Sequence, residues 1–382
     1  MTRLFTIPDR KQSDSIKWKY YPEGVLPLWV ADMDFTSPPE VIQALQERVQ
    51  HGVFGYGGGS NKLSELVAER MEWLYEWKIT TEDILLTPGV ITGFNLTCQA
   101  ITKPGDALVI QPPIYPPFFG VAANAGLREI QCPVDNDGTG NYEINFDQLG
   151  KALNQSKVLM FCNPHNPIGK VYTRTELERI AQLCLQNDVF ICSDEIHSDL
   201  VYKGKQHIPI GSINPEIGQR TITLIAPSKT FNIAGLDCAI LICQNHALME
   251  QIKKARRGIV GSVNVLGTTA AIAAYQYGQP WLDEVLQYLQ ENRDFLYQFV
   301  TENLPGITMR PPDATYLAWL NCSRLDLQQE PYDFFMQNAK VGFNKGSEFG
   351  GDGKTFIRVN YACALETLVE ALDRVRTSLN KK

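Results

Sequence analysis

Five stretches of the chain end an apolar run with a residue whose side chain could do chemistry. They are "LLTPGVITGF" (85–94), "IQPPIYPPFFG" (110–120), "FCNPHNPIG" (161–169), "VFICSDEIHSDLVY" (189–202) and "TLIAPSKTFNIAGLDCAILIC" (223–243). Lys229 in the last stretch has no carboxylate within seven residues of it, so burial would disfavour its charged form. A desolvated amine of this kind can act as a nucleophile and as a base, although a lysine in a surface loop fits the same spacing.

Two of the other stretches offer a phosphate site and an aromatic plate. Gly89, Val90 and Ile91 follow a proline and open a helix, so their backbone N–H groups are free to bind a phosphate. An ordinary helix with proline in its first turn has the same pattern. Tyr115 is hemmed in by prolines just past a strand, which makes it a rigid plate or a core tyrosine in a rigid turn.

The remaining two stretches offer an amide, a carboxylate and an imidazole. Asn163 ends an apolar run, and the prolines after it fix the shape of the loop. Asp194 ends another apolar run, where a carboxylate needs a cation or several donors unless it caps a helix. His197 follows at a spacing that lets it face the same site, or serve only the structure.

Seven short apolar runs are predicted to be the strands that position these residues. They are "DILLT" (83–87), "DALVIQ" (106–111), "LREIQCPV" (127–134), "KVLMFCNP" (157–164), "DVFICSDE" (188–195), "TITLIAPS" (221–228) and "CAILICQ" (238–244). Most are rich in Val, Ile and Leu on both faces, which indicates strands buried on two sides. Residues 173–187 are predicted to be a helix, because Thr173 and Glu176 form a capping box. Alternating strands and helices predict a mostly parallel sheet wrapped by helices, with ligands at the carboxyl ends of its strands.

The pattern changes after residue 278. Residues 280–304 form one long amphipathic helix, and the remainder is typical of a smaller α+β domain. The first 45 residues contain little that could fold alone, so we expect them to pack with that domain. The sequence therefore predicts a large domain over 46–282 and a small domain made of 1–45 and 283–382.

Composition excludes several classes of function. With 382 residues, 44% of them hydrophobic, the chain can bury a sizeable core, and its net charge of −7 argues against a nucleic-acid or anionic-membrane surface. No run approaches the roughly 18 apolar residues of a membrane span. The nine cysteines contain no CxxC pair and the five histidines show no metal-ligand spacing. We expect a reduced, cytoplasmic protein without a metal site.

Taken together, the candidate groups match the parts of a single cofactor. A phosphate cradle, an aromatic plate, an amide, a carboxylate and an amine follow one another on consecutive strand ends. A cofactor with a phosphate, an aromatic ring, a basic ring nitrogen and an aldehyde needs that set. The sequence therefore predicts pyridoxal 5′-phosphate as the cofactor.

The motifs "NPHNPIG", "SDEIH" and "SKTFNIAGL" in series resemble the fold-type I pyridoxal-phosphate enzymes of the class I/II aminotransferase group. The resemblance covers essentially the whole chain. Within the group, "VLPLWVADMDF" (25–35), "DEIHSDL" and "SKTFNIAGL" are most similar to the cystathionine β-lyase, or cysteine C–S lyase, branch. This branch implies α,β-elimination from L-cystathionine or another cysteine S-conjugate, which yields pyruvate, ammonia and a thiol.

The resemblance also implies roles at the cofactor ring. Lys229 would bond covalently to the cofactor aldehyde and act in catalysis, and Asp194 would pair with the protonated pyridine nitrogen. Asn163 and His197 would hydrogen-bond the phenolic oxygen of the ring. Tyr115 would stack on the ring and take part in catalysis.

Further roles concern the phosphate and the substrate. The phosphate would be held by Gly89, Val90, Ile91 and Ser228. Tyr56, in "VFGYGGG", would reach the phosphate of a neighbouring subunit, which implies a homodimer. Arg358, in "FIRVN", would clamp the substrate α-carboxylate, with Ala31 also at the substrate.

One departure and three alternatives accompany this assignment. Many aminotransferases carry a phosphate-binding arginine eight residues after the lysine, where this chain has Asp237. Transamination would use every residue named above and remains the main alternative, and a non-catalytic regulator with a bound cofactor is a second. A dinucleotide site at "GYGGGS" (55–60) is not favoured, because the motif follows no clear strand and lacks its third glycine.

Overall fold

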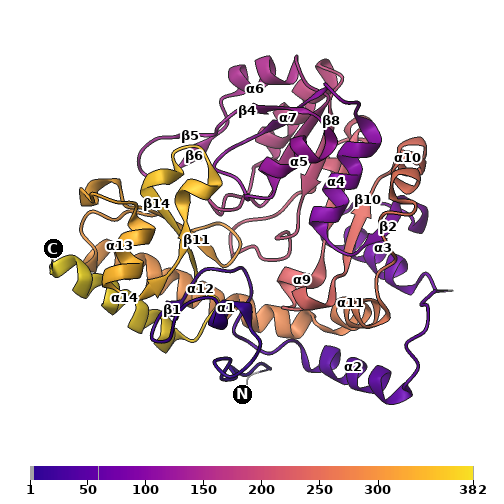
Figure 1. The fold of residues 1–382 in the computed structure, drawn as a ribbon. Coiled ribbons are helices and arrows are strands. Elements are labelled where there is room, and N and C mark those ends of the chain that lie inside the picture. The colour runs from indigo at the N-terminus through magenta and orange to yellow at the C-terminus, as the bar shows by residue number, and fades with distance from the viewer. Residues whose placement is uncertain (1–3, 59, 382) are drawn as a thin grey trace.

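A seven-stranded sheet forms the centre of the computed structural model, which describes residues 4–58 and 60–381 (Figure 1). Its strands in spatial order are β2 (Ile84–Thr87), β10 (Ala239–Ile242), β9 (Thr221–Ile225), β8 (Phe190–Asp194), β7 (Val158–Cys162), β3 (Ala107–Ile110) and β4 (Arg128–Gln131). Strand β10 is antiparallel to both of its neighbours, and the other pairs are parallel. Each of the seven predicted runs contains one of these strands, so the mostly parallel sheet is confirmed.

Both faces of the sheet are buried, as the apolar runs predict. Alternate residues of β7 belong to two different cores, with Met160 and Cys162 in one and Leu159 and Phe161 in the other. The first core is covered by α4 (Val90–Ile101), α5 (Phe118–Ala125) and α10 (His246–Arg256). The second is covered by α6 (Phe146–Leu153) and α7 (Arg174–Gln186), while α3 (Lys62–Tyr75) packs on the β2–β10 end.

Helix α7 confirms the predicted capping box at its start. The backbone N–H of Glu176 donates to Thr173 Oγ1 at 3.3 Å, and the backbone N–H of Thr173 donates to Glu176 Oε2 at 2.8 Å. These two bonds satisfy donors that a helix start leaves unpaired.

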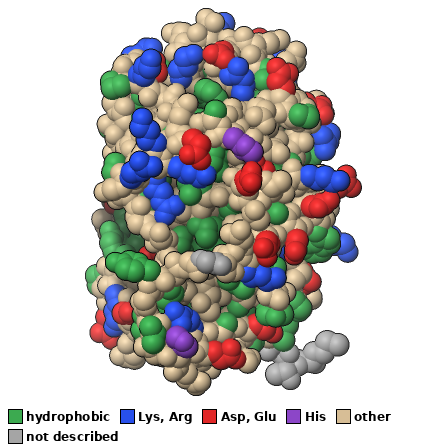
Figure 2. All heavy atoms as spheres, turned by 90° about the vertical axis from the view of Figure 1, so that its right-hand side faces the viewer, with side chains coloured by type: hydrophobic (Ala, Val, Ile, Leu, Met, Phe, Trp, Pro, Cys, Tyr) green, Lys and Arg blue, Asp and Glu red, His purple; other side chains and the backbone are tan. Residues whose placement is uncertain are grey.

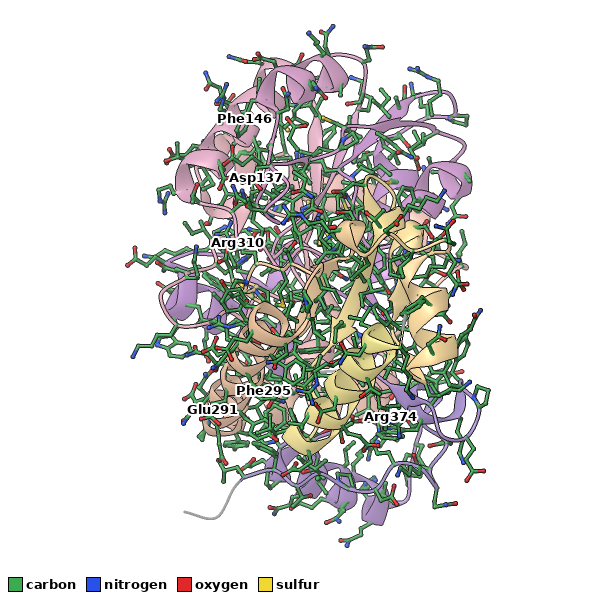
Figure 3. All side chains as sticks on the ribbon, turned by 90° about the vertical axis from the view of Figure 1, so that its left-hand side faces the viewer. Asp137, Phe146, Glu291, Phe295, Arg310 and Arg374 are labelled. Atoms are coloured by element: carbon green, nitrogen blue, oxygen red, sulfur yellow. The ribbon has the colours of Figure 1, made fainter. Side chains whose placement is uncertain are left out.

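The C-terminal third forms a smaller α+β unit. It begins with the predicted long helix, α12 (Gln279–Asn303), and contains a three-stranded antiparallel sheet of β11 (Leu317–Asn321), β14 (Phe356–Asn360) and β13 (Asn344–Lys345). Helices α13 (Pro331–Asn338) and α14 (Leu365–Asn380) pack with it. Figure 3 shows this side of the molecule, with Phe295 labelled on α12 and Arg374 on α14.

The N-terminal segment lies beside this unit (Figure 1). After the short helix α1 (Ile16–Lys19), strand β1 (Leu26–Pro27) pairs in parallel with β12 (Val341–Gly342). Helix α2 (Pro39–His51) instead packs along α11 (Val265–Tyr277). The domain boundaries near residues 46 and 283 remain a prediction. The other short elements are α8 (Pro215–Gly218), α9 (Pro227–Thr230) and the hairpin of β5 (Asp135–Asn136) and β6 (Tyr142–Glu143).

The surface mixes both signs of charge. Figure 2 shows most lysine and arginine side chains of one face in its upper part and hydrophobic side chains around its middle. Over residues 4–58 and 60–381, no helix is both long enough and apolar enough to cross a membrane. The same residues contain no group of three or more His, Cys, Asp or Glu side chains that could hold a metal ion.

Candidate active site

A cavity of 450 Å³ lies at the carboxyl ends of β7, β8 and β9, where an α/β sheet binds its ligands. Nine of the residues that the sequence predicts for the site line this cavity. They are Ala31, Gly89, Val90, Ile91, Tyr115, Asp194, His197, Ser228 and Lys229. Residues far apart in the chain therefore meet at one place.

Lys229 lies on the short helix α9, directly after β9. The next residue anchors this helix, because Thr230 Oγ1 donates to Asp199 Oδ2 at 3.1 Å. Asp199 is itself held by the buried Arg70 at 2.7 Å. The Lys229 amine points into the cavity and donates to the carbonyl oxygen of Ala31 at 2.7 Å.

The surroundings of Lys229 favour its neutral form. Its side chain is open to the cavity but enclosed by protein, and this desolvation lowers the pKa of the amine to about 8. The Asp32 carboxylate opposes the shift, while the Arg358 guanidinium adds to it. An appreciable fraction of the amine is therefore neutral near physiological pH, as a nucleophile or base requires.

Asp194 and His197 lie on the next strand end. Asp194 is the last residue of β8, and its Oδ1 accepts the backbone N–H of Ile196 at 3.1 Å. Burial raises the pKa of this carboxyl to about 7, so a cation inside the cavity would stabilise its charged form. Burial lowers the pKa of His197 to about 3, and its Nδ1 has no hydrogen-bond partner. The imidazole is neutral, so it can donate a hydrogen bond to a bound group or accept one from it.

The start of α4 forms one end of the cavity. No side chain caps this helix and its first turn contains no acidic residue, so the N–H groups of Val90 and Ile91 are available to an anion. Asp237 also lies here: Ala239 pairs with Thr87 in the antiparallel ladder, which brings Asp237 level with Gly89. The position eight residues after the lysine thus faces the cavity, but it carries a negative charge.

Tyr115 lines the cavity from the loop after β3. Its carbonyl oxygen accepts the backbone N–H of Phe118 at 3.0 Å, which fixes the turn into α5. Burial raises the pKa of the phenol, so the hydroxyl stays protonated at neutral pH. A rigid aromatic face and a proton donor are therefore present together.

The structure places Asn163 outside the cavity and corrects its predicted position. The Asn163 side chain is fully buried and used by the fold, because it donates to Ile208 O at 3.3 Å and accepts from Tyr172 N at 3.3 Å. The asparagine of this loop that lines the cavity is Asn166. Along the strand, Cys162 faces the cavity and the next side chain points to the opposite face.

Arg358 lies on β14 behind Asn166 rather than on the cavity wall. Its guanidinium donates to Asn166 Oδ1 at 2.9 Å and to Asn344 Oδ1 at 2.7 Å, and it lies 4.9 Å from the centre of the Phe349 ring. Burial lowers its pKa to about 10, so it remains charged. Within the part of the chain that the structure describes, no carboxylate lies at ion-pair distance, and the charge is met by neutral acceptors.

Tyr56 does not line the cavity of its own chain. Its side chain is fully exposed, at 110% relative accessibility, on the loop after α2. Val53 and Phe54, on the same loop, are 61% and 56% exposed. The loop thus presents an apolar surface to the outside of the subunit.

Sequence reasoning missed several residues of the site. They are Cys162, Asn166 and Tyr316, of which Tyr316 donates its hydroxyl to the carbonyl oxygen of Ala31 at 3.0 Å. The two-residue period of β7 could have identified Cys162 and excluded Asn163, because Met160 and Cys162 share a face. No local signal indicates Tyr316, since only the tertiary fold brings it to Ala31.

Comparisons with known proteins agree with this geometry. The family described as "Aminotransferase class I and II" matches residues 23–375. The cystathionine beta-lyase PatB of Bacillus subtilis (strain 168) is 38% identical over 97% of this chain and 98% of its own. Among solved structures, OvoB is 42% identical with a TM-score of 0.95, over all of both chains. Cystalysin from Treponema denticola, which contains pyridoxal 5′-phosphate, is 33% identical with a TM-score of 0.95, also over all of both chains.

Proposed function

The chain belongs to the aminotransferase class I and II family, and we propose that it is a pyridoxal-phosphate-dependent carbon–sulfur β-lyase. It cleaves L-cystathionine or related cysteine S-conjugates by α,β-elimination to pyruvate, ammonia and a thiol. One observation carries the chemistry: Lys229, with a pKa lowered to about 8, shares a single cavity with Asp194 and the uncapped start of α4. The similarity to cystathionine β-lyases along the whole chain supports the choice of reaction.

The cavity fits pyridoxal 5′-phosphate group by group. The N–H groups at the start of α4 and the Ser228 hydroxyl suit the phosphate, and the neutral Lys229 amine suits the aldehyde. The Asp194 carboxyl, whose pKa burial raises, gains most from a protonated ring nitrogen beside it. Asn166 replaces Asn163 as the amide that we propose to bind the cofactor, and Tyr115 and His197 complete the walls.

Lys229 is the proton carrier of the proposed reaction. When bound, the cofactor accepts the electron pair that remains on the substrate Cα after its proton is removed. The Lys229 amine, neutral in part at pH 7, removes that proton. The resulting ammonium and the protonated Tyr115 hydroxyl are then the donors in the cavity for a departing thiolate.

Arg358 binds the substrate carboxylate in this proposal. Its guanidinium is buried and donates to neutral oxygens, those of Asn166 at 2.9 Å, Asn344 at 2.7 Å and the Trp29 carbonyl at 3.4 Å. A buried cation without an anion has a large unfavourable desolvation energy, which a carboxylate ligand offsets. The planar fork of arginine matches the two oxygens of that carboxylate. Ala31 lies on the same wall, next to Lys229.

Assay of the products distinguishes the lyase from the aminotransferase. The purified enzyme is incubated with L-cystathionine alone, and separately with an amino acid and 2-oxoglutarate. We expect pyruvate and thiol in equal amounts in the first reaction, without any added 2-oxo acid. Formation of glutamate in the second reaction with no pyruvate in the first would overturn the lyase assignment in favour of transamination.

We also infer a homodimer in which Tyr56 reaches the cavity of the neighbouring subunit. Tyr56, Val53 and Phe54 form an exposed apolar loop, and Ile259 and the cavity residue Ile91 are 74% and 44% exposed. Figure 2 shows hydrophobic side chains around the middle of one face, which a second copy would cover. The exposure of Ile91 indicates that the phosphate end of the cavity opens toward such a neighbour.

Mixed dimers test this arrangement. Lys229→Ala and Tyr56→Ala enzymes are each expected to be strongly impaired alone. When the two are unfolded together and refolded, half of the sites in a mixed dimer combine an intact Lys229 with an intact Tyr56. Recovery of activity on mixing supports a shared site, whereas no recovery with a dimer present on light scattering would contradict it.

The cytoplasm is the compartment that we propose for this enzyme. All nine cysteines are buried free thiols. Thiols persist in reducing compartments, and pyridoxal enzymes of amino-acid metabolism need no export. Trapping thiols in intact cells and counting labelled cysteines would test this assignment.

A further inference from the structure

The motif "VADMDF" forms an irregular, bent segment that runs from the small unit to the active-site lysine. We call residues 30–35 the strap. Its second carbonyl oxygen, that of Ala31, accepts hydrogen bonds from Lys229 Nζ at 2.7 Å and from the Tyr316 hydroxyl at 3.0 Å. The strap therefore touches the reacting nitrogen directly.

Two asparagines, the buried Asn360 and the half-buried Asn232, fix the strap on either side of this contact. Asn360 Nδ2 donates to the carbonyl oxygens of Val30 at 2.6 Å and Asp32 at 2.7 Å. Asn232, three residues beyond the lysine, accepts the Met33 N–H at 3.0 Å and donates to the Met33 carbonyl at 3.0 Å. The peptide that bonds the lysine thus has little freedom to move.

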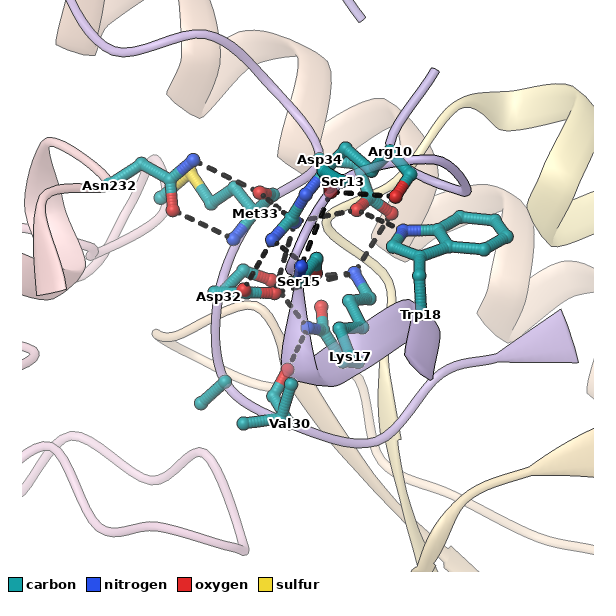
Figure 4. A network of polar contacts seen from close by, with 12 residues as sticks. Arg10, Ser13, Ser15, Lys17, Trp18, Val30, Asp32, Met33, Asp34 and Asn232 are labelled. Carbon is teal, nitrogen blue, oxygen red and sulfur yellow. Dashed lines mark hydrogen bonds and ion pairs between the residues drawn. The ribbon is translucent and has the colours of Figure 1, made fainter. Parts of the chain in front are cut away.

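A network of charges holds the outer edge of the strap (Figure 4). Arg10 bridges its two acidic residues, with NH2 2.8 Å from Asp32 Oδ2 and NH1 2.8 Å from Asp34 Oδ1. The same guanidinium donates to Met33 O at 2.9 Å and to Ser15 Oγ at 2.7 Å. A single side chain therefore joins both carboxylates and the backbone between them.

Lys17 completes the network from α1. Its side chain is fully buried, and Nζ lies 2.9 Å from Asp34 Oδ2 and 3.9 Å from Asp32 Oδ1. Trp18 Nε1 also donates to Asp34 Oδ1 at 3.0 Å. Asp34 is saturated by these partners, whereas Asp32 is held chiefly by Arg10 and keeps part of its surface open.

Asp32 is the member of the network whose charge acts on Lys229. Asp32 follows the residue whose carbonyl binds the lysine, and the charge of its carboxylate raises the pKa of the Lys229 amine. The charged groups and the imidazole that act on Lys229 are Asp32, Asp194, His197 and Arg358. Tyr115, Cys162 and Asp237 line the same cavity, and the Tyr316 hydroxyl shares the Ala31 carbonyl with Lys229. Of all these groups, only Asp32 is paired with cations from the N-terminal segment.

We propose that Arg10 and Lys17 are positioning residues, which set through the strap how strongly the Asp32 carboxylate acts on the nitrogen of Lys229. The proposal rests on the proposed function only in taking Lys229 as the lysine that binds the cofactor. Arg10 shields Asp32, so its removal exposes the full negative charge to that nitrogen. Removal of the Asp32 charge has the opposite effect.

The visible absorbance of the holoenzyme measures this effect. Its change with pH follows protonation of the nitrogen that Lys229 shares with the cofactor. We expect Arg10→Met to raise the midpoint of this titration by roughly 0.5 pH unit and Asp32→Asn to lower it by a similar amount. The double variant should lie between the two single variants. A purely structural role would move both single variants in the same direction, and that result would overturn the proposal.

Arg374→Met is the matched control. Arg374 (Figure 3) also bonds a carboxylate and backbone carbonyls, with Glu370 Oε1 at 2.6 Å and Gly24 O at 2.8 Å, but it has no contact with the strap. This variant should leave the midpoint unchanged. If Arg10→Met does not fold, the direction of the shift in Asp32→Asn decides.

Failure of this inference differs from failure of the proposed function. If Lys229→Ala loses the visible band while the strap variants leave the midpoint unchanged, only the role of the network is wrong. If Lys229→Ala keeps the band, the cofactor lysine itself is misassigned.

Discussion

The N-terminal network and the active site each contain two cations, but they surround them differently. In the network, Arg10 and Lys17 pair with the carboxylates of Asp32 and Asp34 at 2.8–2.9 Å. In the active site, Lys229 donates to a carbonyl oxygen and Arg358, behind the cavity wall, donates to two asparagine oxygens. The paired cations hold the fold together, whereas the cations that meet only neutral acceptors retain an affinity for an anionic or electrophilic ligand.

Removal of a paired cation should produce the largest loss of stability. Lys17→Met leaves the Asp34 carboxylate buried with less compensation, and we expect the free energy of unfolding to fall by about 3–5 kcal/mol. Urea denaturation measures this loss. As a control, Lys253→Met removes an exposed partner of Glu250 and should cost less than about 1 kcal/mol. Similar losses of stability in the two variants would show that the buried pair of Lys17 and Asp34 contributes no more than an exposed pair.

Removal of an unpaired cation should instead impair the reaction. Arg358→Lys keeps the charge but loses the planar fork, and we expect kcat/KM for L-cystathionine to fall about 100-fold, mostly through KM. Steady-state kinetics measure this change. Arg293→Lys is the control that leaves kcat/KM unaltered, because Arg293 on α12 packs over the Tyr202 ring at 4.4 Å and does not line the cavity. A change of less than about threefold in Arg358→Lys would show that the substrate carboxylate binds elsewhere.

The two asparagines of the loop after β7 also differ in this way: one supports the fold and the other contributes to the active site. Asn166→Ala removes a partner of Arg358 at the cavity, so kcat/KM should fall about 10- to 100-fold, together with some loss of stability from the unpaired Arg358 N–H. Asn163→Ala leaves the Tyr172 N–H and the Ile208 carbonyl unpaired, which should lower the free energy of unfolding by about 1–3 kcal/mol. A large fall in kcat/KM in Asn163→Ala, with little change in Asn166→Ala, would return the cofactor role to Asn163.

The last expected effect is a pH dependence of stability in the cofactor-free enzyme. Burial raises the pKa of Asp194 from 3.8 to about 7, so the folded state holds a proton that the unfolded state has released. The stability of the wild type relative to Asp194→Asn should therefore fall as pH rises from about 4 to 7, by at most about 1.4 kcal/mol per pH unit. Urea denaturation of both proteins at several pH values measures it. A constant difference would contradict the raised pKa.

Much of the fold was predictable because its strands are buried on both faces. Continuous apolar runs such as 158–162 and 239–242 identify a strand without any tertiary information, and the capping box at Thr173 identifies the start of α7. The position of α2 could not be predicted, because an apolar stripe on a helix does not indicate which partner the helix packs against. In the structure α2 packs on α11 rather than on the small unit.

The site was predictable at three strand ends. Lys229, Asp194 and the start of α4 reach the cavity from such positions. Asn163 does not, because successive residues of a strand point to opposite faces and the cavity face belongs to Cys162. The strap network was not predictable, since nothing in the spacing of Arg10, Lys17, Asp32 and Asp34 shows that the chain folds back on itself there.

The most direct test of the account is to identify the lysine that carries the cofactor. Borohydride reduces the bond between pyridoxal 5′-phosphate and its lysine to a stable amine, and peptide mass spectrometry then locates the adduct. We predict a single modified peptide containing Lys229 and none containing Lys17, which is buried but paired with Asp34. A cofactor adduct on Lys17 or any other lysine, with Lys229 unmodified, would contradict the claim that burial without a carboxylate partner makes Lys229 the reactive amine.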